Sequence, residues 1–240
     1  MVRVVVLRGI KPFQEQMSRK VSLSEKVDPK TGLPLLEEES KLLFKPKQGL
    51  AYWLFAKPVA WLSKVIFPLK VSGRENIPKK GGLVIAFNHI CNLDAVTISA
   101  TAPRKLYFLG KVELSRGLKG RLFNSAGIIP VDRSRRNSEA LETAVQALKR
   151  GSVVAIAPEG YTNTSGELAP FKFGAVAMAG RAKVPIVPTA IVGRYTPFTR
   201  KLTINYGKPI KVSANKLEDA NEKLWYTINN MREKIIKGRV

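Results

Sequence analysis

The chain has 240 residues, of which 45% are hydrophobic and 25% are charged, the proportions of a folded globular protein rather than a disordered one. Its single cysteine excludes an internal disulfide, and the single histidine beside it argues against a zinc site, so we expect a reducing compartment and no metal. The formal net charge of +23 predicts an anionic partner, which is a nucleic acid, an acidic membrane surface or an acidic carrier protein.

The first part of the chain differs in composition from the rest. Residues 1–48 mix charges with prolines and are expected to form an irregular arm. Residues 50–69 are mostly apolar and aromatic, and their two lysines, Lys57 and Lys64, stand seven apart on one helical face. Pro58 is expected to divide this segment into two short helices. We therefore predict that residues 1–70 are an N-terminal arm with amphipathic helices on an anionic membrane surface. The alternative is an ordinary amphipathic helix packed on the core.

A membrane-spanning segment is not expected. No run of about eighteen apolar residues is present, and the apolar run at residues 4–7 is too small for a secretion signal. The predicted location is therefore the cytoplasmic face of the cell membrane, with peripheral, monotopic attachment.

Residues 71–240 alternate short apolar runs with helical patterns and are predicted to form one domain. Such alternation is typical of an α/β protein. The predicted fold class is α/β, with a mixed, mostly parallel sheet flanked by helices and preceded by the interfacial helical arm. The predicted strands are 83–87, 106–109, 128–131, 153–157, 185–192 and 202–206, and the predicted helices are 138–148 and 217–236.

The only histidine, His89, follows the apolar run 83–87 and precedes Asp94 by five residues. On one continuous helix these two side chains would point about 140° apart. If His89 instead ends a strand and Asp94 lies in the first turn of the next helix, with Asn92 as the N-cap, the carboxylate can fold back toward the imidazole. Such a pair suits general-base chemistry, because the carboxylate fixes the tautomer of the ring. The alternative is an ordinary loop histidine and a helix-start carboxylate.

Three further segments end apolar runs with polar residues, as expected if a site forms at the carboxyl ends of strands. They are 127–133, which ends in Val-Asp-Arg, 157–161, which contains Pro-Glu-Gly, and 184–191, which begins Val-Pro-Ile-Val-Pro. Together with the His-x4-Asp block, these segments resemble, in order and spacing, the four sequence blocks of the glycerolipid acyltransferases. The resemblance covers residues 70–215 and is greatest to the bacterial 1-acylglycerol-3-phosphate acyltransferases.

The resemblance implies transfer of a fatty acyl group from a thioester, on coenzyme A or acyl carrier protein, to the hydroxyl of a lysophospholipid, without a cofactor. In such an enzyme His89 is the general base and Asp94 orients it, and backbone N–H groups at the start of the following helix meet the oxyanion. Arg133, Glu159 and Gly160 then form the acceptor site, and Arg133 binds the phosphate. For Arg133 the alternative is a solvated charge, and for Glu159 a turn residue.

One departure from the family pattern affects the acceptor. The family usually continues Pro-Glu-Gly with Thr-Arg, whereas Tyr161 and Thr162 follow here, so a cation is absent from this block. Lys111, Lys172 or Arg194 could replace it, or the acceptor could be another lysolipid.

A basic nucleic-acid-binding protein is the alternative from a different functional class. It would explain the charge, but it would not explain the aromatic residues Trp53 and Trp61, and no nucleic-acid-binding module is recognisable. A nucleic-acid partner is therefore not expected.

Overall fold

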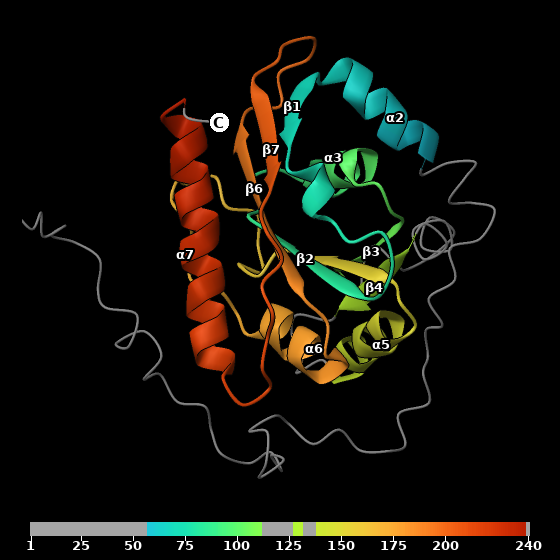
Figure 1. The fold of residues 1–240 in the computed structure, drawn as a ribbon. Helices are drawn as coiled ribbons and strands as arrows, with labels where there is room; N and C mark the ends of the chain where they lie inside the picture. The colour runs from blue at the N-terminus through green and yellow to red at the C-terminus, as the bar shows by residue number, and fades with distance from the viewer. Residues whose placement is uncertain (1–56, 112–126, 132–137, 239–240) are drawn as a thin grey trace, which may run out of the picture. The chain divides into compact units, whose positions relative to one another are not determined.

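The computed structural model describes residues 57–111, 127–131 and 138–238. Seven strands form one sheet in the order β1-β7-β6-β2-β5-β3-β4 (Figure 1). All neighbouring strands pair in parallel except β6 and β7, which are antiparallel. The strands are β1 Leu69–Ser72, β2 Leu83–Phe87, β3 Leu106–Lys111, β4 Ile128–Val131, β5 Val153–Ile156, β6 Ile186–Gly193 and β7 Leu202–Tyr206. The α-helices are α2 Lys57–Ile66, α3 Asp94–Thr101, α5 Ser138–Lys149, α6 Gly174–Ala182 and α7 Leu217–Ile236, and a short 3-10 helix, η2, spans Arg74–Asn76.

The central strand β2 explains why the sheet is parallel at this point. All five of its residues are buried, and it lies between β5 and β6, both parallel to it. A strand covered on both faces reads as a continuous apolar run, and Leu83–Phe87 is such a run. Its side chains alternate between two apolar clusters, with Val84 and Ala86 on one face and Ile85 and Phe87 on the other.

Helices cover both faces of the sheet. Residues of α5, α6 and α7 pack in the cluster that contains Val84, and Ile98 of α3 packs in the cluster that contains Ile85. Buried hydroxyl groups on the second face are paired: Thr101 Oγ1 lies 2.7 Å from the Tyr206 hydroxyl oxygen. Burial raises the pKa of Tyr206 to about 12. The two faces together form the core below the strand ends that carry the predicted site.

The mixed, mostly parallel sheet predicted from the sequence is confirmed, with strand and helix limits within two residues of the predicted ones. Three elements were missed, one of which is the short 3-10 helix η2. Helix α6 is buried around most of its circumference and consists largely of small residues, so it lacks the one-sided apolar pattern of a surface helix. Strand β1 has only four partly exposed residues and begins at Leu69, inside the segment assigned to the arm.

The predicted amphipathic segment is described only from residue 57 onward. Helix α2 spans Lys57–Ile66, and Pro58 stands in its first turn, where a missing N–H removes no helical hydrogen bond. The predicted partner helix, together with Trp53, lies outside the described residues. In the part of the chain that the structure describes, no helix has the length and hydropathy needed to cross a membrane.

Candidate active site

His89 and Asp94 meet at the corner between β2 and α3. His89 Nδ1 lies 2.8 Å from Asp94 Oδ2, the Asp94 side chain is 0% exposed and that of His89 is 17% exposed. Asp94 is in the first turn of α3, as predicted. Because the carboxylate occupies Nδ1, that nitrogen carries the proton of the neutral ring and Nε2 is left as the basic atom.

The loop between His89 and α3 wraps around this carboxylate. Asp94 Oδ2 also accepts hydrogen bonds from the backbone N–H groups of Ile90, at 2.7 Å, and Cys91, at 2.9 Å. These two loop N–H groups are therefore occupied by the carboxylate, and the oxyanion contacts expected from N–H groups at the start of α3 stay a prediction. The prediction of Asn92 as N-cap is wrong, because Leu93 holds that position.

Asn88 links the ends of two strands directly before His89. Its side chain is buried, its Nδ2 donates to the carbonyl of Ile191 at 2.8 Å, and its Oδ1 accepts from the N–H of Ile191 at 2.7 Å. A buried amide that exchanges both bonds with a backbone group extends the β2–β6 pairing beyond Phe87. The base of the His89 loop is thus fixed to β6.

Glu159, predicted to lie in the acceptor site, is 2% exposed and contacts the histidine loop. Its Oε1 accepts from the backbone N–H of His89 at 2.9 Å, and its Oε2 accepts from Asn163 Nδ2 at 2.6 Å and from the N–H of Ala169 at 3.1 Å. Asn163 in turn donates its N–H to the carbonyl of His89. Glu159 therefore joins the 159–169 segment to the backbone of His89.

Thr162 stands in the family block where an arginine is usual, and it faces the basic atom of the histidine. Its Oγ1 lies 3.1 Å from His89 Nε2 and 3.4 Å from Asn92 Oδ1. The imidazole is therefore contacted at both nitrogens, by a buried carboxylate on one side and by an exposed hydroxyl on the other. Nε2 has one lone pair, so another hydroxyl that reaches it must take the place of Thr162 Oγ1.

The structure describes the remaining predicted site residues to different extents. Gly160 has φ of +80°, and a Cβ added there would lie 2.9 Å from Lys172 Nζ, so the exposed Lys172 side chain lies over this glycine. Lys111 is the last residue of β3, but its side chain is outside the described part of the structure. Arg133 lies outside the described residues altogether.

Tyr195, which follows β6, is a site residue that the sequence analysis missed. Its hydroxyl donates to Asp94 Oδ1 at 2.6 Å and lies 2.8 Å from Thr97 Oγ1. Burial, together with the charge of Asp94, raises the pKa of Tyr195 well above its usual value, so the phenol remains a neutral donor. Only the pairing of β2 with β6 brings it here, and no sequence spacing signals that contact.

Replacing Tyr195 with phenylalanine is expected to lower kcat about tenfold. The change removes one hydrogen bond to a buried carboxylate, and such bonds are worth about 1.5–3 kcal/mol. The ring and its edge-to-face contact with Phe67, at 5.6 Å between centroids, would remain. Steady-state kinetics will test this, with thermal unfolding as the check on folding. Wild-type kcat in the variant would show that Asp94 is held without Tyr195.

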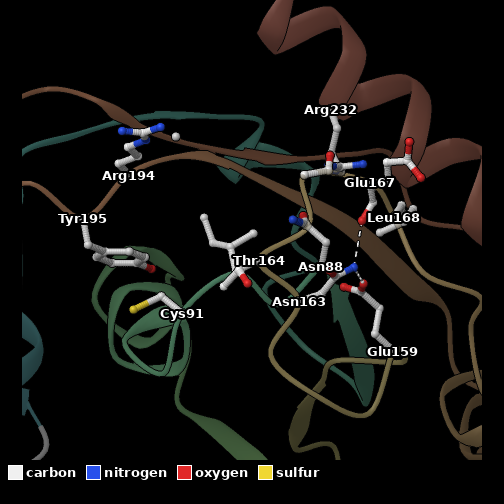
Figure 2. Close-up of a pocket in the computed structure, with 13 residues that line it drawn as sticks. Asn88, Cys91, Glu159, Asn163, Thr164, Glu167, Leu168, Arg194, Tyr195 and Arg232 are labelled. Carbon is white, nitrogen blue, oxygen red and sulfur yellow. Dashed lines mark hydrogen bonds between the residues drawn. The ribbon is translucent and has the colours of Figure 1, made fainter.

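A cavity of about 490 Å³ opens beside this cluster (Figure 2). Figure 2 shows Arg194 and Tyr195 on one side of it, Glu159 and Asn163 on the other, and Arg232 reaching in from α7. Burial lowers the pKa of Arg232, and the charge of Glu159 opposes that shift. The cavity is lined by Asn88, Ile90, Cys91, Glu159, Asn163, Thr164, Gly166, Glu167, Leu168, Gly193, Arg194, Tyr195 and Arg232.

Helix α7 holds the segment that forms one wall of this cavity. Asn221 Nδ2 donates to the carbonyl of Phe171 at 3.1 Å, Trp225 Nε1 to that of Ala169 at 3.0 Å and Arg232 Nη2 to that of Gly166 at 2.6 Å. Three side chains of one helix thus satisfy backbone carbonyls along residues 166–171. The 159–171 segment is thereby positioned from both ends, by Glu159 and by α7.

Within the described residues, no group of three or more His, Cys, Asp or Glu side chains is placed to hold a metal ion. The chemically competent group that the structure presents is the imidazole of His89. A partly exposed base, oriented by a buried carboxylate at the carboxyl end of a parallel sheet, is the arrangement of an α/β enzyme that removes a proton from its substrate.

Comparison with known proteins identifies the family of α/β enzymes to which this site belongs. A family model described as Acyltransferase matches residues 68–192, more than half of the chain. The 1-acyl-sn-glycerol-3-phosphate acyltransferase of Bacillus subtilis (strain 168) is 33% identical over 164 residues, which cover 66% of this chain and 80% of that protein. The enzyme of the same name from Borreliella burgdorferi is 29% identical over 184 residues, covering 74% of this chain and 73% of that protein. The chain therefore belongs to the acyltransferase family, and the resemblance seen in the sequence is confirmed.

A solved structure supports the fold independently. The 1-acyl-sn-glycerophosphate (LPA) acyltransferase PlsC from Thermotoga maritima superposes with a TM-score of 0.64 over 77% of this chain and 80% of that chain. The two sequences are 21% identical, so this likeness concerns the fold. The family model ends at residue 192, before Tyr195 and α7. The contacts that Tyr195 and α7 make with the site therefore come from residues outside the region that the family model matches.

Proposed function

We propose that this acyltransferase moves a fatty acyl group from an acyl thioester to the free hydroxyl of 1-acylglycerol-3-phosphate, giving phosphatidic acid, at a membrane surface. The observation that carries the proposal is the 2.8 Å contact between His89 Nδ1 and the buried Asp94 carboxylate in a chain of this family. Two bacterial relatives named for this reaction, at 33% and 29% identity, support the choice of acceptor.

In the proposed mechanism, the acceptor hydroxyl replaces Thr162 Oγ1 at His89 Nε2 and passes its proton to that nitrogen as its oxygen attacks the thioester carbonyl. The tetrahedral intermediate then collapses, the carbon–sulfur bond breaks, and the proton on the imidazolium goes to the departing thiolate. Asp94 stabilises the imidazolium in between, because its buried charge has no water to screen it. No covalent acyl-enzyme forms, and thiols ionise near pH 8.5, so the leaving group needs little assistance.

The acceptor phosphate requires cations near this base. We assign that role to Arg133, as the family resemblance implies, and to Lys111 and Lys172 as replacements for the cation missing after Pro-Glu-Gly; the exposed amine of Lys172 lies over Gly160. Glu159 acts on the acceptor indirectly, by fixing the backbone on both sides of the histidine ring. Thr162 stands where the family usually has arginine, which keeps a different lysolipid acceptor as the alternative.

The other participants in the proposal are a thioester donor and a lipid surface. The donor is acyl-coenzyme A or acyl carrier protein, used as a co-substrate, and no cofactor is needed. The peripheral location at the cytoplasmic face of the membrane is supported by α2, which exposes Trp61 at 66% and also Leu62 and Val65. Nucleic acid is not proposed as a partner.

The reaction is tested by offering the purified protein several lysolipids with each donor and identifying the products by mass spectrometry. We expect phosphatidic acid from 1-acylglycerol-3-phosphate, and at least tenfold less product from lysophosphatidylcholine or lysophosphatidylglycerol. Preferential acylation of either of these lipids would overturn the acceptor assignment and leave acyl transfer in place. An absence of any product with both donors would overturn the reaction itself.

A further inference from the structure

The turn between β6 and β7 carries an aromatic side chain that the fold does not use. Phe198 is 77% exposed, and its backbone has φ of +57°, a conformation that is strained for a bulky residue. A large apolar side chain presented to solvent from a strained turn contributes nothing to the core. Its position therefore calls for a partner outside the described fold.

The turn is held firmly in place against α2. The backbone N–H of Phe198 donates to the carbonyl of Ile66, the last residue of α2, at 2.6 Å. At the base of the hairpin, Gly193 has φ of +118°, and a Cβ there would lie 1.8 Å from the carbonyl oxygen of Lys201, so only glycine fits this close approach. Figure 1 shows the tip of the β6–β7 hairpin beside the end of α2 that leads into β1.

Helix α2 presents an apolar stripe next to this turn. Pro58, Trp61, Leu62 and Val65 are exposed and have the i, i+3, i+4, i+7 spacing of one helical face, while Ser63 is buried. Because the backbone of Phe198 is hydrogen-bonded to Ile66, the residue after Val65, the turn adjoins the end of this stripe. We refer to Phe198 and these four α2 residues as the apolar edge.

The charged residues in the two segments that carry the apolar edge all have the same sign. Residues 58–70 and 193–203 contain five basic residues and no aspartate or glutamate. All five are exposed. Exposed cations in the same segments as exposed apolar side chains match an anionic bilayer, which offers hydrocarbon for the aromatic rings and negative headgroups for the basic side chains. The basic residues are Lys64, Lys70, Arg194, Arg200 and Lys201.

We propose that the apolar edge is a single docking surface for an anionic lipid bilayer, with Phe198 inserting at headgroup depth as an anchor separate from α2. The proposal rests on the membrane-surface part of the proposed function and adds a second contact to it. Tyr195, in the same turn, donates to Asp94, so a bilayer seated on Phe198 would lie against the segment that orients the base.

Co-sedimentation with vesicles tests the contribution of Phe198. Wild-type protein, Phe198→Ala, Trp61→Ala and the control Tyr226→Ala would be compared on vesicles of phosphatidylcholine alone and of an equal mixture with phosphatidylglycerol. Tyr226 is an exposed aromatic residue on α7, outside the apolar edge. We expect about tenfold weaker partitioning to the anionic vesicles for Phe198→Ala and for Trp61→Ala, as for loss of one inserted aromatic side chain, and no change for the control. Phe198→Asn repeats the test with a residue that tolerates positive φ.

Insertion itself is tested by fluorescence. Phe198→Trp is expected to gain emission that lipids brominated along the acyl chain quench, beyond the signal of the native tryptophans, whereas Tyr226→Trp is not. If wild-type protein fails to bind anionic vesicles, the membrane-surface part of the proposed function is wrong as well. If it binds, while both Phe198 variants bind equally well and the new tryptophan is not quenched, only the role of Phe198 is overturned.

Discussion

Replacing His89 with alanine is expected to lower kcat for acyl transfer about 10³-fold, while the protein stays folded. A positioned general base contributes about 10²- to 10⁴-fold, and no second histidine exists in the chain to substitute for it. The imidazole is partly exposed and is not part of the buried core, so its removal leaves the packing of β2 and α3 intact. Single-turnover rates with saturating donor and acceptor measure the effect on the chemical step.

The matched control is Cys91→Ala in the same loop. Cys91 contacts Asp94 through its backbone N–H, which alanine keeps, and its thiol lines the cavity without a role in the proposed mechanism. We expect wild-type kcat for this variant. Loss of activity in Cys91→Ala together with normal turnover in His89→Ala would exchange the proposed direct transfer for a thiol nucleophile.

The parts of the site that sequence could predict are local in the chain. His89 and Asp94 are five residues apart, and the strand-to-helix change between them is written in the apolar pattern on either side. A carboxylate in the first turn of a helix can reach back only a few residues, so the pairing follows once the corner is recognised. The same reasoning does not extend to the N-cap, because the Asp94 side chain itself organises the loop.

The parts that sequence could not predict depend on strand order. Asn88 and Tyr195 act across the β2–β6 pairing, which joins segments about one hundred residues apart. The sequence of either segment alone predicts neither the pairing nor its register. Likewise, the apolar stripe of α7 is visible in the sequence, whereas the three donors that it sends to residues 166–171 can be found only from coordinates.

These long-range contacts show how the site is kept rigid. Glu159 accepts a hydrogen bond from the backbone of His89, and Asn88, the preceding residue, is hydrogen-bonded to β6. The Asp94 carboxylate accepts a further hydrogen bond from Tyr195. The imidazole can therefore move little relative to the strand ends. Such orientation speeds the reaction only if the folded protein already holds the groups in place before substrate binds. Buried polar groups with full hydrogen bonding meet that condition.

Asp94→Asn is expected to have an effect of the same order, a decrease in kcat of about 10²- to 10⁴-fold. An amide in place of the carboxylate removes the charge that stabilises the imidazolium and allows the ring to adopt the other tautomer, with its proton on Nε2. The buried oxygen that now accepts from His89, Ile90 and Cys91 would in one amide orientation be an NH₂ group facing two N–H donors. The role of the charge is tested by measuring kcat with each acyl donor, after circular dichroism has shown that the variant is folded like the wild type.

Stability separates this charge effect from simple loss of structure. Leaving buried donors unpaired costs about 1–3 kcal/mol, so Asp94→Asn should also lower the free energy of unfolding by that order. Tyr195→Phe perturbs the same carboxylate while keeping its charge, and serves as the comparison. If Asp94→Asn destabilises the protein but keeps the rate of Tyr195→Phe, the carboxylate only supports the loop. A kcat far below that of Tyr195→Phe, at similar stability, is the result expected if its negative charge acts on the imidazolium during acyl transfer.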